Sequence, residues 1–169
     1  MKQIKALTFD LDDTLWDNRP VLAAAEQTLY DWLLRHYPRI GQRYTIEGLR
    51  GMRKGLVYKR PELGHDMTEL RKTSLRMAAD AVGYDHSLVA PAFEVFIRAR
   101  HRILLYDDVI PALKTFRQAG YRIASLTNGN ADIKRLGLGH LFDFSLSAEM
   151  VGKGKPDPQI FTAACRQAM

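Results

Sequence analysis

Two kinds of hydrophobic pattern follow one another along this chain of 169 residues. Residues 4–9 form a short, largely apolar run without Gly or Pro, which is typical of a buried strand. From Asn18 onward apolar residues recur at helical spacing as far as His36. Pro38 and Gly41 then predict the end of this helix.

The following segments, as far as Leu104, are predicted to be almost entirely helical. Helices are expected from Asp66 to Val82 and from about residue 88 to 104, the first with a capping-box-like pair, Asp66 and Glu69. Residues 45–58 contain three glycines, at positions 48, 51 and 55, which weaken a helix. We therefore expect this segment to be broken or mobile.

Strands and helices alternate again after residue 106. The expected elements are a helix from Asp107 or Asp108 to Gly120, a strand at 121–126, a turn at 127–130, a short helix to about Leu138, a strand at 144–147 and a helix at 159–167. This order predicts an α/β fold, a Rossmann-like parallel sheet with helices on its faces. Residues 1–15 and 107–169 would form the core, and residues 16–106 a helical insertion that covers the carboxyl ends of the strands.

The composition fits a globular protein, with 46% apolar and 26% charged residues. A single cysteine, Cys165, excludes an internal disulfide. No secretory signal is visible, and no apolar run approaches the roughly 18 residues that span a bilayer. We therefore expect a cytoplasmic protein without a membrane partner.

The net charge of +6 is concentrated in the middle of the chain. Residues 16–106 contain fifteen Lys and Arg and ten Asp and Glu, so this segment carries +5 of that total. The excess favours an anionic partner such as a small phosphorylated metabolite. Nucleic-acid binding through the basic segment 50–60 is a weaker hypothesis, because no recognised binding fold accompanies it, and a solvated helical face is the simplest interpretation.

Candidate chemistry begins directly after the first strand. Asp10 and Asp12 are two residues apart, and such side chains in an extended segment point to the same side. Two carboxylates held together repel each other unless a cation or a shared proton lies between them. The pair therefore indicates metal-assisted chemistry.

Polar residues also follow the other predicted strands. Thr127 and Asn128 end the second strand, and the loop with Lys153 and Lys155 comes after the third. Because the carboxyl ends of parallel strands line one crevice, we expect these groups to converge. Two carboxylates, a hydroxyl, an amide and a lysine suit phosphoryl transfer, which needs a nucleophile, a proton shuttle and a cation against the developing charge.

The chain resembles the haloacid dehalogenase-like hydrolase superfamily, most of whose members are magnesium-dependent phosphatases. Residues 9–15, FDLDDTL, are similar to its first motif, Asp-x-Asp-x-Thr after an apolar strand. Residues 126–129, LTNG, resemble its second motif, and residues 155–158, KPDP, resemble its third. The helical insertion matches the cap of the subgroup whose cap follows the first strand, so the resemblance covers essentially the whole chain.

The resemblance implies definite roles for these residues. Asp10 would be the nucleophile that forms an aspartyl-phosphate, and Asp12 the general acid and then the base. Mg²⁺ would be bound by the carboxylate of Asp10 and the main-chain carbonyl of Asp12. Thr127 would bind a phosphoryl oxygen beside the backbone of Asn128. Lys155, favoured over Lys153 by its Lys-Pro match, would neutralise charge.

Asp12 also selects among the chemistries of the superfamily. The haloacid dehalogenases lack this second acid, because a halide leaving group needs no proton, so Asp12 indicates phosphate esters. Phosphomutases of the superfamily retain this acid and stay open as an alternative. Residues 10–20, DLDDTLWDNRP, and 126–130, LTNGN, look most like bacterial flavin mononucleotide (FMN) phosphatases of riboflavin synthesis. Trp16 and the basic segment 50–60 could contact an aromatic, anionic substrate, although a tryptophan at such a hinge is more often a packing residue and such a basic run more often a solvated face.

One motif of the superfamily has no counterpart here. Its fourth motif is an acidic pair, often Gly-Asp-x-x-x-Asp, after a further strand, whereas this chain has no Asp beyond Asp157. The resemblance thus predicts a C-terminally truncated core with weakened Mg²⁺ binding and an uncovered sheet edge, through which the chain could self-associate. The alternative function is a non-catalytic phosphate-binding or assembly module.

Overall fold

A computed structural model describes residues 4–169 and divides the chain into two compact units. One unit contains the N-terminal residues up to 18 together with 103–169, and the other contains residues 19–102. The sequence placed the division at 15/16 and 106/107, close to these positions. We call the first the α/β unit and the second the helical unit.

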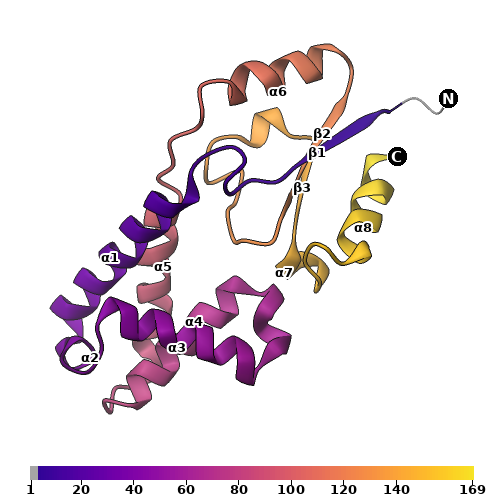
Figure 1. The fold of residues 1–169 in the computed structure, drawn as a ribbon. Helices are drawn as coiled ribbons and strands as arrows, with labels where there is room; N and C mark the ends of the chain where they lie inside the picture. The colour runs from indigo at the N-terminus through magenta and orange to yellow at the C-terminus, as the bar shows by residue number, and fades with distance from the viewer. Residues whose placement is uncertain (1–3) are drawn as a thin grey trace. The chain divides into compact units, whose positions relative to one another are not determined.

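The α/β unit is built on a parallel sheet of three strands (Figure 1). The strands follow the order β1-β2-β3, which confirms the predicted parallel sheet. Within residues 4–169 β1 pairs only with β2, so self-association through its other edge stays a prediction. The strands are β1 (Ala6–Phe9), β2 (Arg122–Thr127) and β3 (Phe144–Ser147).

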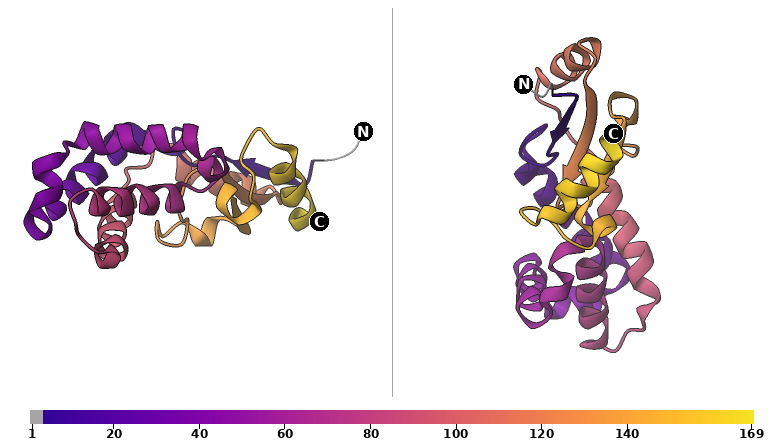
Figure 2. Two further views of the ribbon diagram at one scale, coloured as in Figure 1. Left: turned by 90° about the horizontal axis from the view of Figure 1, so that it is seen from below. Right: turned by 90° about the vertical axis from the view of Figure 1, so that its right-hand side faces the viewer.

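Helices pack on both faces of this sheet, because successive side chains of a strand point to opposite faces. On one face Ala124 and Leu126 form a buried cluster with Ile160 of α8 (Pro158–Ala168), which runs beside the strands in Figure 2. On the other face the ring of Phe9 lies 5.9 Å from that of Phe116 in α6 (Val109–Gln118). Both helices end close to their predicted positions.

The connection between β2 and β3 differs from the prediction. The expected short helix to Leu138 is a series of turns, followed by a short 3₁₀ turn at Gly139–Leu141. Gly137, with φ at 74°, ends the turns because this conformation suits Gly, which has no Cβ. A four-residue helix that the sequence pattern did not predict, α7 (Ala148–Val151), follows β3 directly.

The helical unit has a core of its own. Ala25, Leu29 and Leu33 of α1 pack with Leu75 and Phe96 from two later helices, because apolar residues at helical spacing share one face. The principal helices are α1 (Asn18–His36), α2 (Pro38–Arg43), α3 (Ile46–Lys59), α4 (Met67–Asp80) and α5 (Val89–Arg100).

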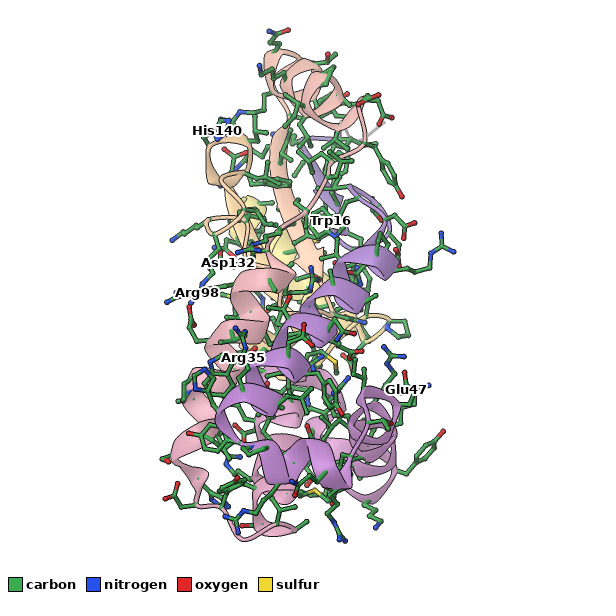
Figure 3. The ribbon with its side chains drawn as sticks, turned by 90° about the vertical axis from the view of Figure 1, so that its left-hand side faces the viewer. Trp16, Arg35, Glu47, Arg98, Asp132 and His140 are labelled. Atoms are coloured by element: carbon green, nitrogen blue, oxygen red, sulfur yellow. The ribbon has the colours of Figure 1, made fainter. Side chains whose placement is uncertain are left out.

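Helix α3 corrects the expectation of a broken segment at 45–58, since it is continuous. Thr45 caps it by accepting a hydrogen bond from the Gly48 N–H, and Glu47 (labelled in Figure 3) places an acidic group in its first turn. Leu49 and Leu56 are buried. Capping and packing thus outweigh the low helix propensity of the three glycines.

None of the helices within residues 4–169 has both the length and the apolar character needed to cross a membrane.

Candidate active site at the strand ends

Asp10 lies at the carboxyl end of β1, where the chain leaves the sheet. Its Oδ1 accepts a hydrogen bond from the Leu11 N–H at 2.8 Å, and its side chain is 43% exposed. The chain then makes one helical turn, closed by the Leu15 N–H donating to the Leu11 carbonyl at 2.9 Å. Asp12 lies in this turn and is partly exposed. Both predicted carboxylates therefore follow the strand end directly, and Asp10 is open to a reactant.

The residues after Asp12 hold the turn in place. Asp13 adopts the left-handed conformation, with φ at 59°, and its Oδ1 accepts a hydrogen bond from the Asn18 N–H at 2.9 Å. This contact satisfies a free N–H at the start of α1, as an N-terminal cap does. Trp16 (Figure 3) is fully buried, in agreement with a packing role.

Thr127 is the last residue of β2 and is buried, with 1% of its surface exposed. Its Oγ1 accepts a hydrogen bond from the Gly129 N–H at 2.9 Å. This bond fixes the side chain, and a hydroxyl that accepts one bond can still donate its own hydrogen. Thr127 thus presents a positioned donor at the end of β2.

Lys155 joins the ends of β1 and β2. Its Nζ lies 2.8 Å from Asp10 Oδ1 and donates a hydrogen bond to the Leu126 carbonyl at 2.7 Å. Its side chain is only 22% exposed, whereas Lys153 is an exposed residue. The structure thus brings Lys155 to Asp10, as the motif match predicted, and it adds the Leu126 carbonyl, which sequence reasoning missed.

The side chain of Asn128 makes contacts that the sequence did not predict. Its Oδ1 accepts a hydrogen bond from the Lys155 N–H at 2.7 Å, and its Nδ2 donates to the Lys155 carbonyl at 2.8 Å. The carboxamide is thus engaged with the loop that carries Lys155. The resemblance predicts that the backbone of Asn128 lies beside the bound phosphate. Binding of phosphate by its main-chain N–H stays a prediction.

The oxygen donors at this site are few. Among residues 4–169 no three His, Cys, Asp or Glu side chains cluster in a way that could hold a metal ion. The carboxylate of Asp10 and the main-chain carbonyl of Asp12 are nevertheless the hard oxygen donors that Mg²⁺ takes, and Mg²⁺ commonly uses one or two carboxylates and several waters. Both donors are of the kind that this ion takes, and Mg²⁺ binding by them stays a prediction.

The basic segment 50–60 belongs to α3 and the residue after it. Arg50 and Arg53 both form ion pairs with Glu26, and Arg60 forms one with Glu62. Three of the five basic residues in this segment therefore have acidic partners within the helical unit. Contacts of this segment with a substrate or with nucleic acid stay predictions.

The sequence profile described as haloacid dehalogenase-like hydrolase matches residues 4–168. This chain belongs to that family. The match covers nearly all of the described chain, including Asp10, Thr127 and Lys155. The protein is therefore a hydrolase by family.

Two curated relatives are similar over almost the whole chain. The 5-amino-6-(5-phospho-D-ribitylamino)uracil phosphatase YigB of Escherichia coli (strain K12) is 32% identical over 169 residues, which cover 98% of this chain and 70% of the relative. The phosphoserine phosphatase of Thermus thermophilus is 28% identical, over 95% of this chain and 74% of the relative.

A solved structure has nearly the same fold. The crystal structure of 2-haloacid dehalogenase from Pseudomonas syringae pv. Tomato DC3000 aligns with a TM-score of 0.91 and 40% identity. The alignment covers 98% of this chain and 73% of that one. Within one family this chain is thus similar both to proteins named as phosphatases and to one named as a dehalogenase.

Proposed function

We propose that this family member is a phosphatase that hydrolyses phosphoric monoesters of small metabolites through an aspartyl-phosphate on Asp10. The observation that carries the proposal is the 2.8 Å contact between Lys155 Nζ and Asp10 Oδ1 at the joined ends of β1 and β2. A carboxylate nucleophile beside a fixed cation suits attack on an anionic phosphoryl group. Asp12 and the names of the two curated relatives support phosphate esters as substrates.

In the first half-reaction an oxygen of Asp10 attacks phosphorus and the ester P–O bond breaks. We assign the attack to Oδ2, since the contacts with Leu11 and Lys155 both use Oδ1. The leaving alcohol oxygen takes a proton from the carboxylic acid of Asp12. The Lys155 ammonium and the Thr127 hydroxyl stabilise charge on the phosphoryl oxygens.

In the second half-reaction water hydrolyses the aspartyl-phosphate. The Asp12 carboxylate, left by the first proton transfer, takes a proton from the water that attacks phosphorus. The bond from phosphorus to Asp10 breaks, inorganic phosphate leaves and the Asp10 carboxylate is restored. Asp12 is then protonated again, so the cycle closes without another source of protons.

The Asp10 carboxylate and the Asp12 main-chain carbonyl would hold Mg²⁺. The ion, when bound, supplies positive charge that lowers repulsion between the nucleophile and the phosphoryl oxygens. The turn at Leu11–Leu15 fixes the main chain of Asp12, and the hydrogen bond from the Leu11 N–H fixes the carboxylate of Asp10.

The proposed substrates carry a 5-phosphoribityl chain on a heterocycle. FMN has this chemistry, and so does the compound in the name of the Escherichia coli relative. A phosphate on a flexible polyol chain can reach a carboxylate at a strand end. The net charge of +6 is compatible with such an anionic substrate.

Phosphate release by the 169-residue chain tests the proposal. The substrates are FMN, 5-amino-6-(5-phospho-D-ribitylamino)uracil, phosphoserine and p-nitrophenyl phosphate, each with Mg²⁺ and with EDTA. We expect Mg²⁺-dependent release, fastest with a phosphoribityl compound, and none from Asp10→Asn. Undiminished release by Asp10→Asn would contradict the assignment of the nucleophile.

Dehalogenation is the second candidate, favoured by the 40% identity to the Pseudomonas syringae protein named as a 2-haloacid dehalogenase. In that reaction Asp10 would attack carbon and a halide would leave. Asp12 disfavours it, because a halide needs no proton. Halide release from L-2-chloropropionate, measured with EDTA present, distinguishes the two, and we expect none.

The remaining alternative is a non-catalytic phosphate-binding or assembly module. It predicts that phosphate binds with Mg²⁺ in a calorimeter while none of the substrates above is turned over. Turnover that depends on Asp10 would exclude this alternative.

A further inference from the structure

Two loops that are 27 residues apart in sequence are joined by the side chain of one asparagine. Asn128 accepts from the Lys155 N–H at 2.7 Å and donates to the Lys155 carbonyl at 2.8 Å. A carboxamide that bonds both main-chain groups of one residue acts like a neighbouring strand, and it fixes the residue in position and in orientation. Asn128 thus holds the backbone of Lys155 while its own backbone continues β2.

Gly154 makes this contact sterically possible. A Cβ at this position would lie 2.7 Å from Asn128 Oδ1 and 3.1 Å from Ala148 Cβ. The carboxamide oxygen is held by its hydrogen bonds, so it cannot move away freely as the end of a flexible chain would. Gly154 is not among the residues with positive φ, so close approach, and not backbone conformation, requires glycine here.

We propose that Asn128 and Gly154 form a positioning pair that holds the Lys155 ammonium against Asp10. Lys155 is attached at two points to the end of β2, through its backbone to Asn128 and through Nζ to the Leu126 carbonyl at 2.7 Å. Nζ then has a fixed place from which it reaches Asp10 Oδ1 at 2.8 Å. Loss of the backbone attachment would let the loop withdraw and weaken this contact.

The role of the pair in turnover rests on the proposed function, but its effect on Lys155 does not. Chemical acetylation therefore tests the geometry without activity, with Lys153, an exposed neighbour on the same loop, as an internal reference. We expect the acetylation rate of Lys155, divided by that of Lys153 and measured by mass spectrometry, to rise several-fold in Asn128→Ala and in Gly154→Ala.

Gly139→Ala is the matched control for Gly154→Ala, since a Cβ at residue 139 would meet its nearest atom, Lys134 Cγ, at an ordinary 3.6 Å. This variant should leave the acetylation ratio of Lys155 to Lys153 unchanged. An unchanged ratio in both Asn128→Ala and Gly154→Ala would overturn the proposal. Because both lysines lie on one loop, a general loosening of the fold would raise both acetylation rates and leave their ratio unchanged.

A double-mutant cycle on turnover supplies the second test. Asn128→Ala and Gly154→Ala should each lower kcat more than they raise KM, because the displaced Lys155 ammonium acts mainly on charge that develops in the transition state. The double variant should be about as active as Asn128→Ala alone, since the clash at residue 154 exists mainly with the carboxamide. If the losses of kcat in the two single variants multiply in the double variant, Asn128 and Gly154 act independently, and the proposed pair would be contradicted. Absence of wild-type turnover with a changed acetylation ratio would contradict the proposed function and leave the positioning pair supported.

Discussion

Lys155 Nζ lies 2.8 Å from Asp10 Oδ1, although 145 residues separate the two in the sequence (155 minus 10). The pair has 22% and 43% exposed side chains, so it is partly open to water and to an anionic reactant. Ion pairs of this exposure contribute little to stability, typically about 0–1 kcal/mol. The position of the pair at the strand ends is therefore better explained by chemistry than by folding.

Replacing Lys155 tests this interpretation. We expect Lys155→Met to lower kcat/KM for phosphate esters by about 10²–10³-fold, as does the loss of one group that stabilises developing charge. Lys153→Met is the matched control, because Lys153 is exposed on the same loop and makes no described contact with Asp10. Steady-state phosphate release measures both. A larger loss of kcat/KM in Lys153→Met than in Lys155→Met would show that Lys153, and not Lys155, supplies the cation.

The hydroxyl of Thr127 gives the second prediction. Thr127→Val keeps the shape of a buried side chain but removes the acceptor of the Gly129 N–H and the donor for a phosphoryl oxygen. We expect kcat to fall about 10²-fold, the lower end of the range for one lost donor. Thr127→Ser retains the hydroxyl and should stay within a few-fold of wild type. Equal activity of the Val and Ser variants would contradict the role of the Thr127 hydroxyl in binding a phosphoryl oxygen.

The helical unit offers a prediction about stability. Glu26 is buried and accepts hydrogen bonds from Arg50 and Arg53, with Arg71 at 3.5 Å. Burial tends to raise the pKa of Glu26, but the hydrogen bond from Arg50 and the charges of Arg53 and Arg71 outweigh it and hold this pKa below its ordinary value. Burial, followed by the charge of Arg53, lowers the pKa of Arg71 to about 9, so its guanidinium is still charged at pH 7.

Glu26→Gln should therefore destabilise the protein by about 3 kcal/mol at pH 7, because buried guanidinium groups lose their counter-charge. The folded-state pKa of Glu26 is lowered, so its contribution is present above the unfolded-state pKa and is lost as pH falls through the folded-state value. The difference in unfolding free energy between wild type and Glu26→Gln should thus shrink below about pH 4.5, near the unperturbed pKa of Glu. Urea denaturation across this pH range measures it. A difference that is constant with pH would contradict the ionised state of Glu26.

Helix α3 provides a prediction of increased stability. A Cβ at Gly51 or Gly55 would meet no atom within 4 Å. Because both positions lie inside a continuous helix, Gly51→Ala and Gly55→Ala should each stabilise the protein by about 0.5–1 kcal/mol. Gly152→Ala is the contrasting variant and should destabilise it, since Gly152 has φ at 79° and ends α7. Destabilisation by both α3 variants would mean that this helix is not continuous in solution.

Much of this fold follows from local patterns in the sequence. The strands β1 and β3 were predictable from short local patterns: β1 is a largely apolar run, although its residues are partly exposed and not buried as expected, and β3 alternates the buried Phe144 and Leu146 with serine. The capping pair was predictable for a local reason as well, since Asp66 accepts from the Glu69 N–H at 2.7 Å. The adjacent ends of β1 and β2 both lie beside Lys155, whose Nζ contacts Asp10 Oδ1 and the carbonyl of Leu126, the residue before Thr127.

The parts that were not predicted depend on contacts between distant residues. The continuity of α3 is supported by Leu49 and Leu56, which are buried, and by Arg53, which meets Glu26 from α1. No local pattern reports such partners, so glycine propensity misled the prediction. The bonds between Asn128 and the Lys155 backbone are likewise invisible in sequence, although Gly154 next to the lysine was a signal of close approach.

The double role of Asp12 yields the sharpest kinetic prediction. In Asp12→Asn the proton donor for the leaving group and the base for water are both lost. p-Nitrophenolate leaves without a proton, so phosphorylation of Asp10 by p-nitrophenyl phosphate should continue while hydrolysis of the aspartyl-phosphate slows. Rapid mixing should then give a burst of p-nitrophenol close to one equivalent per active site, followed by turnover about 10²–10⁴-fold slower than wild type.

An alkyl phosphate such as FMN distinguishes the two roles, because its alcohol needs a proton to leave. Asp12→Asn should therefore show no burst with FMN, and Asp10→Asn should show none with either substrate. A burst of p-nitrophenol from Asp10→Asn would place the covalent intermediate on another residue. Wild-type turnover of FMN by Asp12→Asn would show that proton transfer to the leaving alcohol does not depend on Asp12, and it would contradict the acid and base roles proposed for this residue.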